Sequence, residues 1–142
     1  MTARPEDGSA AGPDKIRRPQ RWTLALAAIA GLALLIIGMR FLLVPHQAAR
    51  FFGLSNPPGT YDLHYIVALR DLWLALLLIG LAGMREWRAL SLGLGLGAAV
   101  CLADALIVAS SSGRGWAIAF HVGSGFYCAA VAWAASGMQS NR

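Results

Sequence analysis

The stretch "HYIVALRDLWLALLLIGLAG" (64–83) is apolar enough to cross a membrane, yet it carries Arg70 and Asp71 side by side. A helix needs about 20 predominantly apolar residues to span the hydrocarbon, because each residue adds about 1.5 Å. A charged residue at the centre of such a helix costs roughly 2.5–3.5 kcal/mol, so these charges need partners from other segments. The stretch therefore predicts a helical membrane protein whose helices enclose a polar region.

The rest of the chain contains enough apolar sequence to supply those helices. Of its 142 residues 57% are hydrophobic and 13% charged, whereas soluble domains carry about 25% charged residues. Apolar segments cover 22–44, 63–83, 90–110 and 116–136, and the short connections 84–89 and 111–115 favour antiparallel neighbours. We expect an all-α, integral membrane, antiparallel four-helix bundle over 22–137. A disordered tail over 1–21 and a short C-terminal tail over 138–142 would flank it.

The long connection between the first two spans carries a helix signal of its own. "PHQAARFFG" (45–53) has Pro45 in a first turn and Gly53 where a helix commonly ends, which predicts a short interfacial helix. "SNPPGT" (55–60) is typical of a turn back toward the membrane. Gly93 and Gly97 form a GxxxG pattern, which favours close approach of a neighbouring helix.

The distribution of basic residues predicts the orientation. Lys and Arg number five in 1–21, two in 84–89 and one in 138–142, against only Arg50 and Arg114 on the other side of the spans. By the positive-inside rule both termini are cytoplasmic. All but one of the twelve basic residues are Arg, which suggests a GC-rich bacterial genome. We therefore expect a multi-pass protein of the bacterial inner membrane, in contact with membrane lipid.

Five ionisable residues lie within the spans at a common depth: Arg40, Arg70, Asp71, Asp104 and His121. In the predicted orientation all five lie roughly 6–12 Å below the outer hydrocarbon boundary, and all four helices contribute. The two Arg and two Asp residues compensate each other in charge. Adjacent helical residues point about 100° apart, so we predict that Asp71 meets Arg40 and Arg70 meets Asp104, with His121 bonded to either acid.

This predicted polar cluster has two interpretations. A buried salt-bridge network can fix helix register and do nothing else, and Arg40 alone can extend to the outer headgroups. Ionisable residues inside a membrane also mark ligand sites and proton paths. The functional interpretation is a site for a small polar or amphipathic ligand, or for a proton moved through His121 and Asp104.

Other chemistries receive less support from the sequence. Cys101 and Cys128 show no CxxC or Cys/His ligand spacing, so we expect free buried thiols, no metal site and no cofactor. The basic residues form no stripe for nucleic acid, and no phosphate-binding glycine loop or HExxH is present. The serines at 110–112 precede His121 by a few residues, which leaves an intramembrane hydrolase as the least favoured alternative. No catalytic residue is predicted.

Four segments together resemble an uncharacterised family of small four-helix membrane proteins, a domain of unknown function akin to the DoxX-like group. They are "GMRFLLVPHQAARFFG" (38–53), "LRDLWLALLL" (69–78), "ADALIV" (103–108) and "FHVGSG" (120–125). The resemblance implies a four-helix membrane bundle with no established activity. Links of the DoxX-like group to quinone-dependent sulfur oxidation and oxidative stress imply an alternative role. In that role the chain is a redox or assembly subunit that meets quinone or a membrane protein partner.

Overall fold

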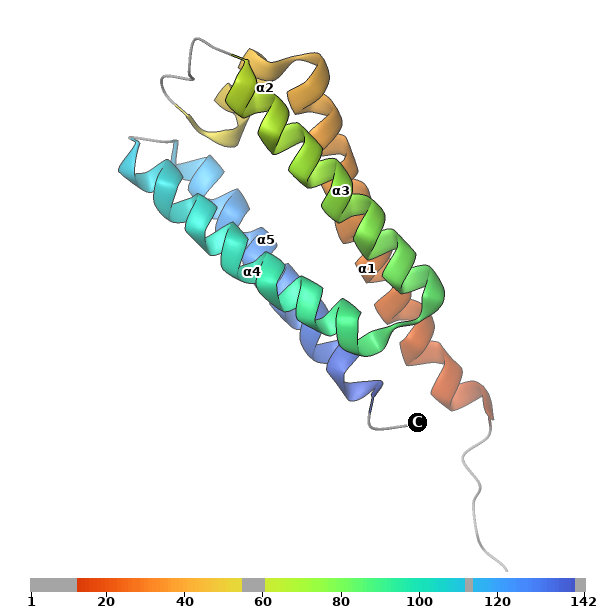
Figure 1. Cartoon of the computed structure of the whole chain (residues 1–142). Coiled ribbons are helices and arrows are strands. Elements are labelled where there is room, and N and C mark those ends of the chain that lie inside the picture. Colours follow the sequence, from red (N-terminus) through yellow and green to blue (C-terminus); the bar gives the residue numbers. More distant parts are fainter. Residues whose placement is uncertain (1–12, 55–60, 112–113, 140–142) are drawn as a thin grey trace, which may run out of the picture.

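The structure is a computed structural model that describes residues 13–54, 61–111 and 114–139, with side chains from residue 18 onward. Within these ranges it contains five helices and no strand. They are α1 (Pro13–Leu43), α2 (Pro45–Phe52), α3 (Asp62–Met84), α4 (Trp87–Ser110) and α5 (Gly115–Gly137). Figure 1 shows the four long helices running antiparallel, with α2 at the end where α3 begins. The predicted all-α, antiparallel four-helix membrane bundle is confirmed.

Each long helix meets the length and composition needed for a membrane span. The apolar spans are Arg18–Leu43, Asp62–Met84, Trp87–Ser110 and Gly115–Gly137, of 23 to 26 residues. At about 1.5 Å per residue these exceed the roughly 30 Å of hydrocarbon. Large apolar side chains also cover the outside of the bundle, with Trp133 81% and Phe126 71% exposed. Acyl chains suit such a surface, and the chain is a multi-pass membrane protein.

Helix α1 begins earlier than the sequence analysis expected. It starts at Pro13 rather than at Trp22, so the end of the predicted disordered tail is helical. Proline is favoured in a first helical turn, and the Lys and Arg residues that follow are good helix formers that can lie outside the hydrocarbon. Residues 1–12 lie outside the described residues, as do the predicted turn 55–60 and the last residues of the C-terminal tail.

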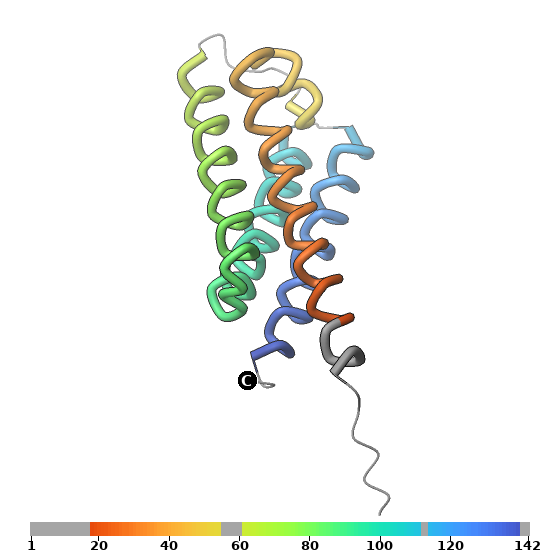
Figure 2. The backbone as a smooth tube through the Cα atoms, turned by 90° about the vertical axis from the view of Figure 1, so that its right-hand side faces the viewer, coloured from red at the N-terminus to blue at the C-terminus, as the bar shows by residue number. Residues whose placement is uncertain are grey.

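The four long helices pack as two pairs, α1 with α3 and α4 with α5 (Figures 1 and 2). Glycines set the close approach within each pair. A Cβ added to Gly31 would lie 2.7 Å from Ile79 Cγ1, and one on Gly38 would lie 3.0 Å from the Ala68 carbonyl oxygen. On α5, a Cβ at Gly125 would lie 3.4 Å from the Ala98 carbonyl oxygen of α4.

Helices α3 and α4 are antiparallel, as their short connection predicted, but they contact each other much less than the partners within each pair. The GxxxG motif of α4 does not mediate close packing between the described helices of this chain. A Cβ on Gly97 would meet no atom within 4 Å, and one on Gly93 would meet only Leu78 Cδ2, at 3.6 Å. Close packing depends on what faces the glycine, and α3 presents its backbone to Gly38 of α1 instead.

Apolar cores join the helices differently at the two ends of the bundle. At the end opposite α2, one core draws on all four long helices: Ala27, Ala30, Leu78, Ala82, Trp87, Leu90, Leu94, Val131, Ala132 and Ala135. At the α2 end, the core of Phe41, Ala48, Ala49 and Ala68 involves only α1, α2 and α3. Among the described residues, the apolar core shared by all four long helices therefore lies at the end opposite α2.

Helix α2 has the bounds and caps that the sequence predicted. Pro45 occupies its first turn, and Gly53 follows it with φ 113°, donating its backbone N–H to the Ala49 carbonyl at 3.2 Å. Only glycine adopts this conformation readily. A Cβ on Gly53 would lie 2.7 Å from Val108 Cγ1 and 2.8 Å from Ala117 Cβ. Helix α2, which packs on α1 and α3, thus ends in contact with α4 and α5.

Candidate functional site

Asp71 is the most deeply buried acid of the predicted cluster, with 3% of the residue exposed on α3. Its partner is the adjacent residue: Arg70 donates from Nε to Asp71 Oδ1 at 3.0 Å. Among the residues that the structure describes, this is the single ion pair. The predicted pairs Asp71–Arg40 and Arg70–Asp104 are not formed. The long guanidinium arm of Arg70, 44% exposed, bends back across the 100° that separates adjacent side chains.

Asp104 lies half-buried on α4 and is not in an ion pair. Its carboxylate interacts electrostatically with Arg70 of α3 and His121 of α5, and Asp71 in turn interacts with Asp104. Within the described part of the chain it forms no salt bridge or side-chain hydrogen bond. Three helices therefore bring Arg70, Asp71, Asp104 and His121 within electrostatic range, and we call these four residues the polar layer.

His121 bonds to α2 and not to an acid. The residue is 7% exposed, and Nε2 lies 3.1 Å from the Phe52 carbonyl oxygen, at the last residue of α2. Its ring centroid is 4.4 Å from that of Phe52. The predicted bond from His121 to Asp71 or Asp104 is replaced by this contact. A buried polar bond therefore links α5 of the polar layer to α2.

Arg40 stands apart from the polar layer. It is exposed on α1, and its Cζ lies 4.8 Å from the centroid of the Phe51 ring, a cation–π contact. Phe51 also packs against Trp116 at 5.1 Å between centroids. Of the five residues predicted to form the cluster, the structure brings four together and places Arg40 on an aromatic surface of α2 and α5.

Two residues that the sequence analysis set aside border the polar layer. The side chains of Cys101 on α4 and Cys128 on α5 interact with each other, and Asp104 and Asp71 lie in electrostatic range of Cys101. Both thiols are free and half-buried. Helical spacing could have placed each cysteine on the face of its own helix that carries a polar-layer residue, since Cys101 precedes Asp104 by three positions and Cys128 follows His121 by seven. Spacing within a helix does not predict that cysteines of two different helices lie close together.

Two histidines at the α2 end also meet through the fold. His46 of α2 and His64 of α3 stack with ring centroids 5.6 Å apart and planes 4° apart, and Tyr61 lies 5.0 Å from His46. His64 is 3% exposed. The sequence placed His46 and His64 near the same membrane boundary, but it gave no signal that their rings stack, because 17 residues lie between them.

The serines offer no nucleophile to His121. Ser110 donates its hydroxyl to the Ile107 carbonyl at 2.9 Å, and Ser111 donates to the Val108 carbonyl at 3.1 Å. Each hydroxyl thus caps its own helix, and Ser112 lies outside the described residues. Among the described residues, a His/Cys/Asp/Glu group of three or more that could hold a metal ion is also lacking.

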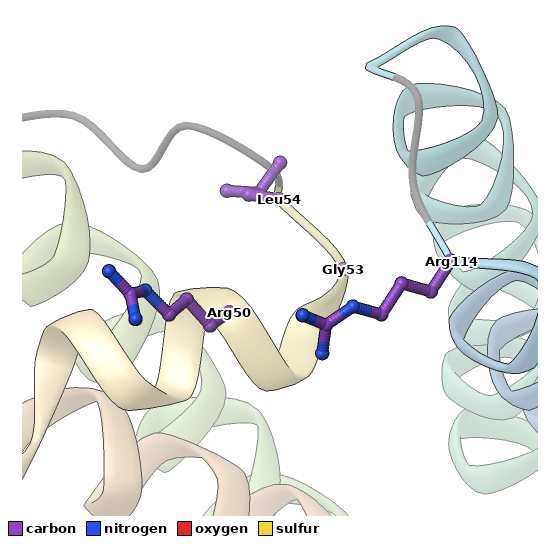
Figure 3. A pocket seen from close by; sticks show the side chains of 4 residues that line it. All are labelled: Arg50, Gly53, Leu54 and Arg114. Atoms are coloured by element: carbon purple, nitrogen blue, oxygen red, sulfur yellow. The ribbon is translucent and has the colours of Figure 1, made fainter.

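A hollow of about 250 Å³ lies at the α2 end and was not predicted. It is lined by Arg50 on α2, Gly53 and Leu54 after it, and Arg114 before α5 (Figure 3). Two basic residues from separate elements therefore flank one space. Each was treated in the sequence as a single charge in a connection, and 63 residues separate them.

The comparisons with known proteins place the chain in a family. The model of a family described as a domain of unknown function (DUF4267) matches residues 31–135. This range includes all four residues of the polar layer, helix α2 and both cysteines. No curated protein and no solved structure matches the chain.

Proposed function

We propose that this chain, which belongs to the DUF4267 family, uses the polar layer as a binding site for a proton or a small polar ligand. The observation that carries the proposal is Asp104. Its half-buried carboxylate lies within electrostatic range of Arg70 and His121 without an ion pair or hydrogen bond from the described residues. An unpartnered carboxylate in a membrane interior is costly. A bound proton, or a ligand that donates a hydrogen bond, removes that cost.

The neighbouring groups suit a site that exchanges a proton. Arg70 donates to Asp71, and His121 supplies an imidazole, a group that often takes part in proton transfer in proteins. Because Arg70 is paired with Asp71, Asp104 is the acid free to take up the ligand. Three different helices hold these groups, so a ligand bound there would also alter helix packing.

The packing of the helix pairs supports access from the α2 end. The apolar core shared by all four long helices lies at the opposite end. At the α2 end the core contains residues of α1, α2 and α3, and His121 of α5 bonds to Phe52 of α2. A ligand entering between the pairs from the α2 end would meet Asp104 and His121 before that core. Entry from the opposite end would require opening it.

The test is infrared difference spectroscopy on the purified protein in lipid during a pH titration. A protonatable Asp104 gives a carboxylic acid band that titrates and disappears in Asp104→Asn. The matched control is Asp62→Asn, which removes an exposed acid from the first turn of α3 and should leave the band. If the wild-type protein and Asp104→Asn give the same spectra, Asp104 is not the proton site.

A second measurement distinguishes a proton-binding site from a path for protons across the membrane. The protein is reconstituted in vesicles that contain a pH-sensitive dye, and a potassium diffusion potential is imposed. Proton movement through the polar layer predicts dye acidification above that of protein-free vesicles, lost in Asp104→Asn and kept in Asp62→Asn. A titrating infrared band without vesicle acidification assigns a binding site and rejects a proton path.

The second candidate function is a DoxX-like membrane redox or assembly subunit that binds quinone or a partner protein. The contact between Cys101 and Cys128 beside the polar layer favours it, since thiols and a proton donor often serve redox chemistry together. Quinone carbonyls accept hydrogen bonds, Arg70 has N–H groups besides the one that it donates to Asp71, and the His121 ring lies in the same polar layer. A fluorescent quinone analogue that binds wild-type protein but not His121→Ala supports this candidate, and equal binding to both rejects it.

A further inference from the structure

We propose that Arg50 and Arg114 bind the phosphate group of an anionic membrane lipid. The two residues flank the hollow of about 250 Å³ between the end of α2 and the start of α5 (Figure 3). The other described residues that line it, Gly53 and Leu54, carry no charge. This site lies outside the polar layer and does not depend on the function proposed for it.

Neither arginine has a charged partner among the described residues. Both are exposed, and within the described part of the chain neither forms a salt bridge or a side-chain hydrogen bond. Guanidinium groups match the geometry of phosphate oxygens and bind them with two parallel hydrogen bonds. Two unpaired guanidinium groups on one hollow therefore favour an anion with several acceptor oxygens.

Both arginines line the hollow, and Arg114 points across it. Figure 3 shows Arg114 extending toward the last turn of α2, whereas the guanidinium of Arg50 points along α2 away from Arg114. Exposed arginines change rotamer within nanoseconds, so Arg50 can turn toward an anion held by Arg114. Gly53 adds no side chain to the floor of the hollow. Arg114 is also the residue that precedes the first turn of α5, where the helix dipole favours negative charge.

The surroundings favour a lipid over a soluble anion. Phe51 adjoins Arg50, Trp116 lies two positions after Arg114, and the rings of Phe51, Trp116 and Phe120 pack together. These three side chains remain 49%, 44% and 48% exposed. Aromatic side chains of this kind collect at the boundary between headgroups and acyl chains. A lipid whose phosphate occupies the hollow can therefore place an acyl chain along the rings.

The experiment measures lipid retained by the purified full-length protein in native mass spectrometry after titration with phosphatidylglycerol or phosphatidylcholine. Wild-type protein should retain phosphatidylglycerol in preference to phosphatidylcholine, whose choline cation opposes the arginines. Arg50→Gln and Arg114→Gln should each weaken phosphatidylglycerol binding by roughly fivefold, since each removes the charge-assisted hydrogen bonds of one guanidinium to the bound phosphate. The double variant should lose the preference.

The matched control is the double variant Arg21→Gln/Arg88→Gln, which removes two exposed arginines from the opposite end and should bind like wild type. Inorganic phosphate, added without lipid and monitored by phosphorus nuclear magnetic resonance, tests the other source of this chemistry. If the protein binds inorganic phosphate but shows no preference between the two lipids, the ligand of the site is a soluble anion, and the proposal of a lipid ligand is overturned. Equal phosphatidylglycerol retention by wild type and the Arg50→Gln/Arg114→Gln variant would overturn the site itself.

Discussion

At the residue scale, the ion pair between Asp71 and Arg70 joins a buried carboxylate to a half-exposed guanidinium. Asp71 has 4% of its side chain exposed and Arg70 has 44%, so the acid depends on the pair more than the base does. An arginine near the surface of the bundle can turn toward water or headgroups, whereas a buried aspartate cannot. The cost of breaking the pair should therefore depend on which partner is removed.

A double-mutant cycle on Arg70→Gln and Asp71→Asn tests this asymmetry. Arg70→Gln leaves the buried carboxylate without its partner and should lower the free energy of unfolding by about 1–3 kcal/mol. Asp71→Asn should cost less, because the exposed Arg70 regains solvent. We expect a coupling energy of about 1 kcal/mol, moderated by that exposure. Unfolding in mixed micelles with increasing dodecyl sulfate provides the measurement.

A second cycle provides its control. Arg40 forms its cation–π contact with Phe51 and no ion pair among the described residues, so Arg40→Gln and Asp71→Asn should be additive. Coupling between Arg40 and Asp71, together with none between Arg70 and Asp71, would contradict the pairing seen here. That result would instead support the Asp71–Arg40 pair that was predicted from the sequence.

At the scale of elements, the short helix α2 connects parts of the bundle that otherwise pack separately. Its Ala48 and Ala49 are buried in the core with α1 and α3. Its last residue accepts a hydrogen bond from His121 of α5, and the following Gly53 packs on Val108 and Ala117. Docking of α2 therefore depends on Gly53, where a Cβ would clash with α4 and α5 and the backbone has a left-handed conformation.

Gly53→Ala should undock α2 from α4 and α5. The left-handed backbone conformation costs a residue with a Cβ roughly 1–2 kcal/mol, and the contacts below 3 Å add about 1–3 kcal/mol of overpacking. Hydrogen exchange read by mass spectrometry should show residues 45–52 exchanging at least tenfold faster, because local opening becomes less costly.

The matched control for that exchange experiment is Gly115→Ala. A Cβ there would meet no atom within 4 Å, and the backbone at the start of α5 is ordinary helix. Exchange in α2 should stay unchanged in this variant. Unchanged exchange in Gly53→Ala as well would mean that α2 does not depend on its contacts with α4 and α5.

The whole molecule combines two helix pairs with an uneven distribution of charge between its ends. Helix α1 begins and α5 ends at the end opposite α2 (Figure 1), where Arg18, Arg21, Arg85 and Arg88 lie among the described residues. The α2 end carries Arg50 and Arg114. We propose from the positive-inside rule that the α2 end faces away from the cytoplasm, which would expose both the hollow and α2 on the outer side.

Labelling of single cysteines in intact cells tests this orientation. In a chain with both native cysteines changed to Ser, Gln47→Cys on α2 should react with a membrane-impermeant maleimide. Arg88→Cys at the start of α4 should react only after lysis. Both positions are exposed, so accessibility within the fold does not bias the comparison. The reverse pattern would invert the orientation and place the α2 end in the cytoplasm.

Hydropathy and local chemistry by themselves determined the spans and α2, because these features depend on neighbours along the chain. Four apolar runs predicted the long helices, and Pro45 and Gly53 predicted α2 at the bounds observed. Only the early start of α1 at Pro13 departed from that pattern, since charged residues also support a helix outside the hydrocarbon.

Only the tertiary structure decided which helices pair and which charges meet. Gly38 approaches α3 because Ala68 and Leu72 present their backbone there, whereas Gly97 faces no atom of a neighbour. Arg70 pairs with Asp71, and His121 bonds to Phe52. The predicted depth of these residues in the membrane did not distinguish between their possible partners. Depth along a helix follows from counting residues, but rotation about its axis depends on the neighbours that pack against it, and rotation selects the partner.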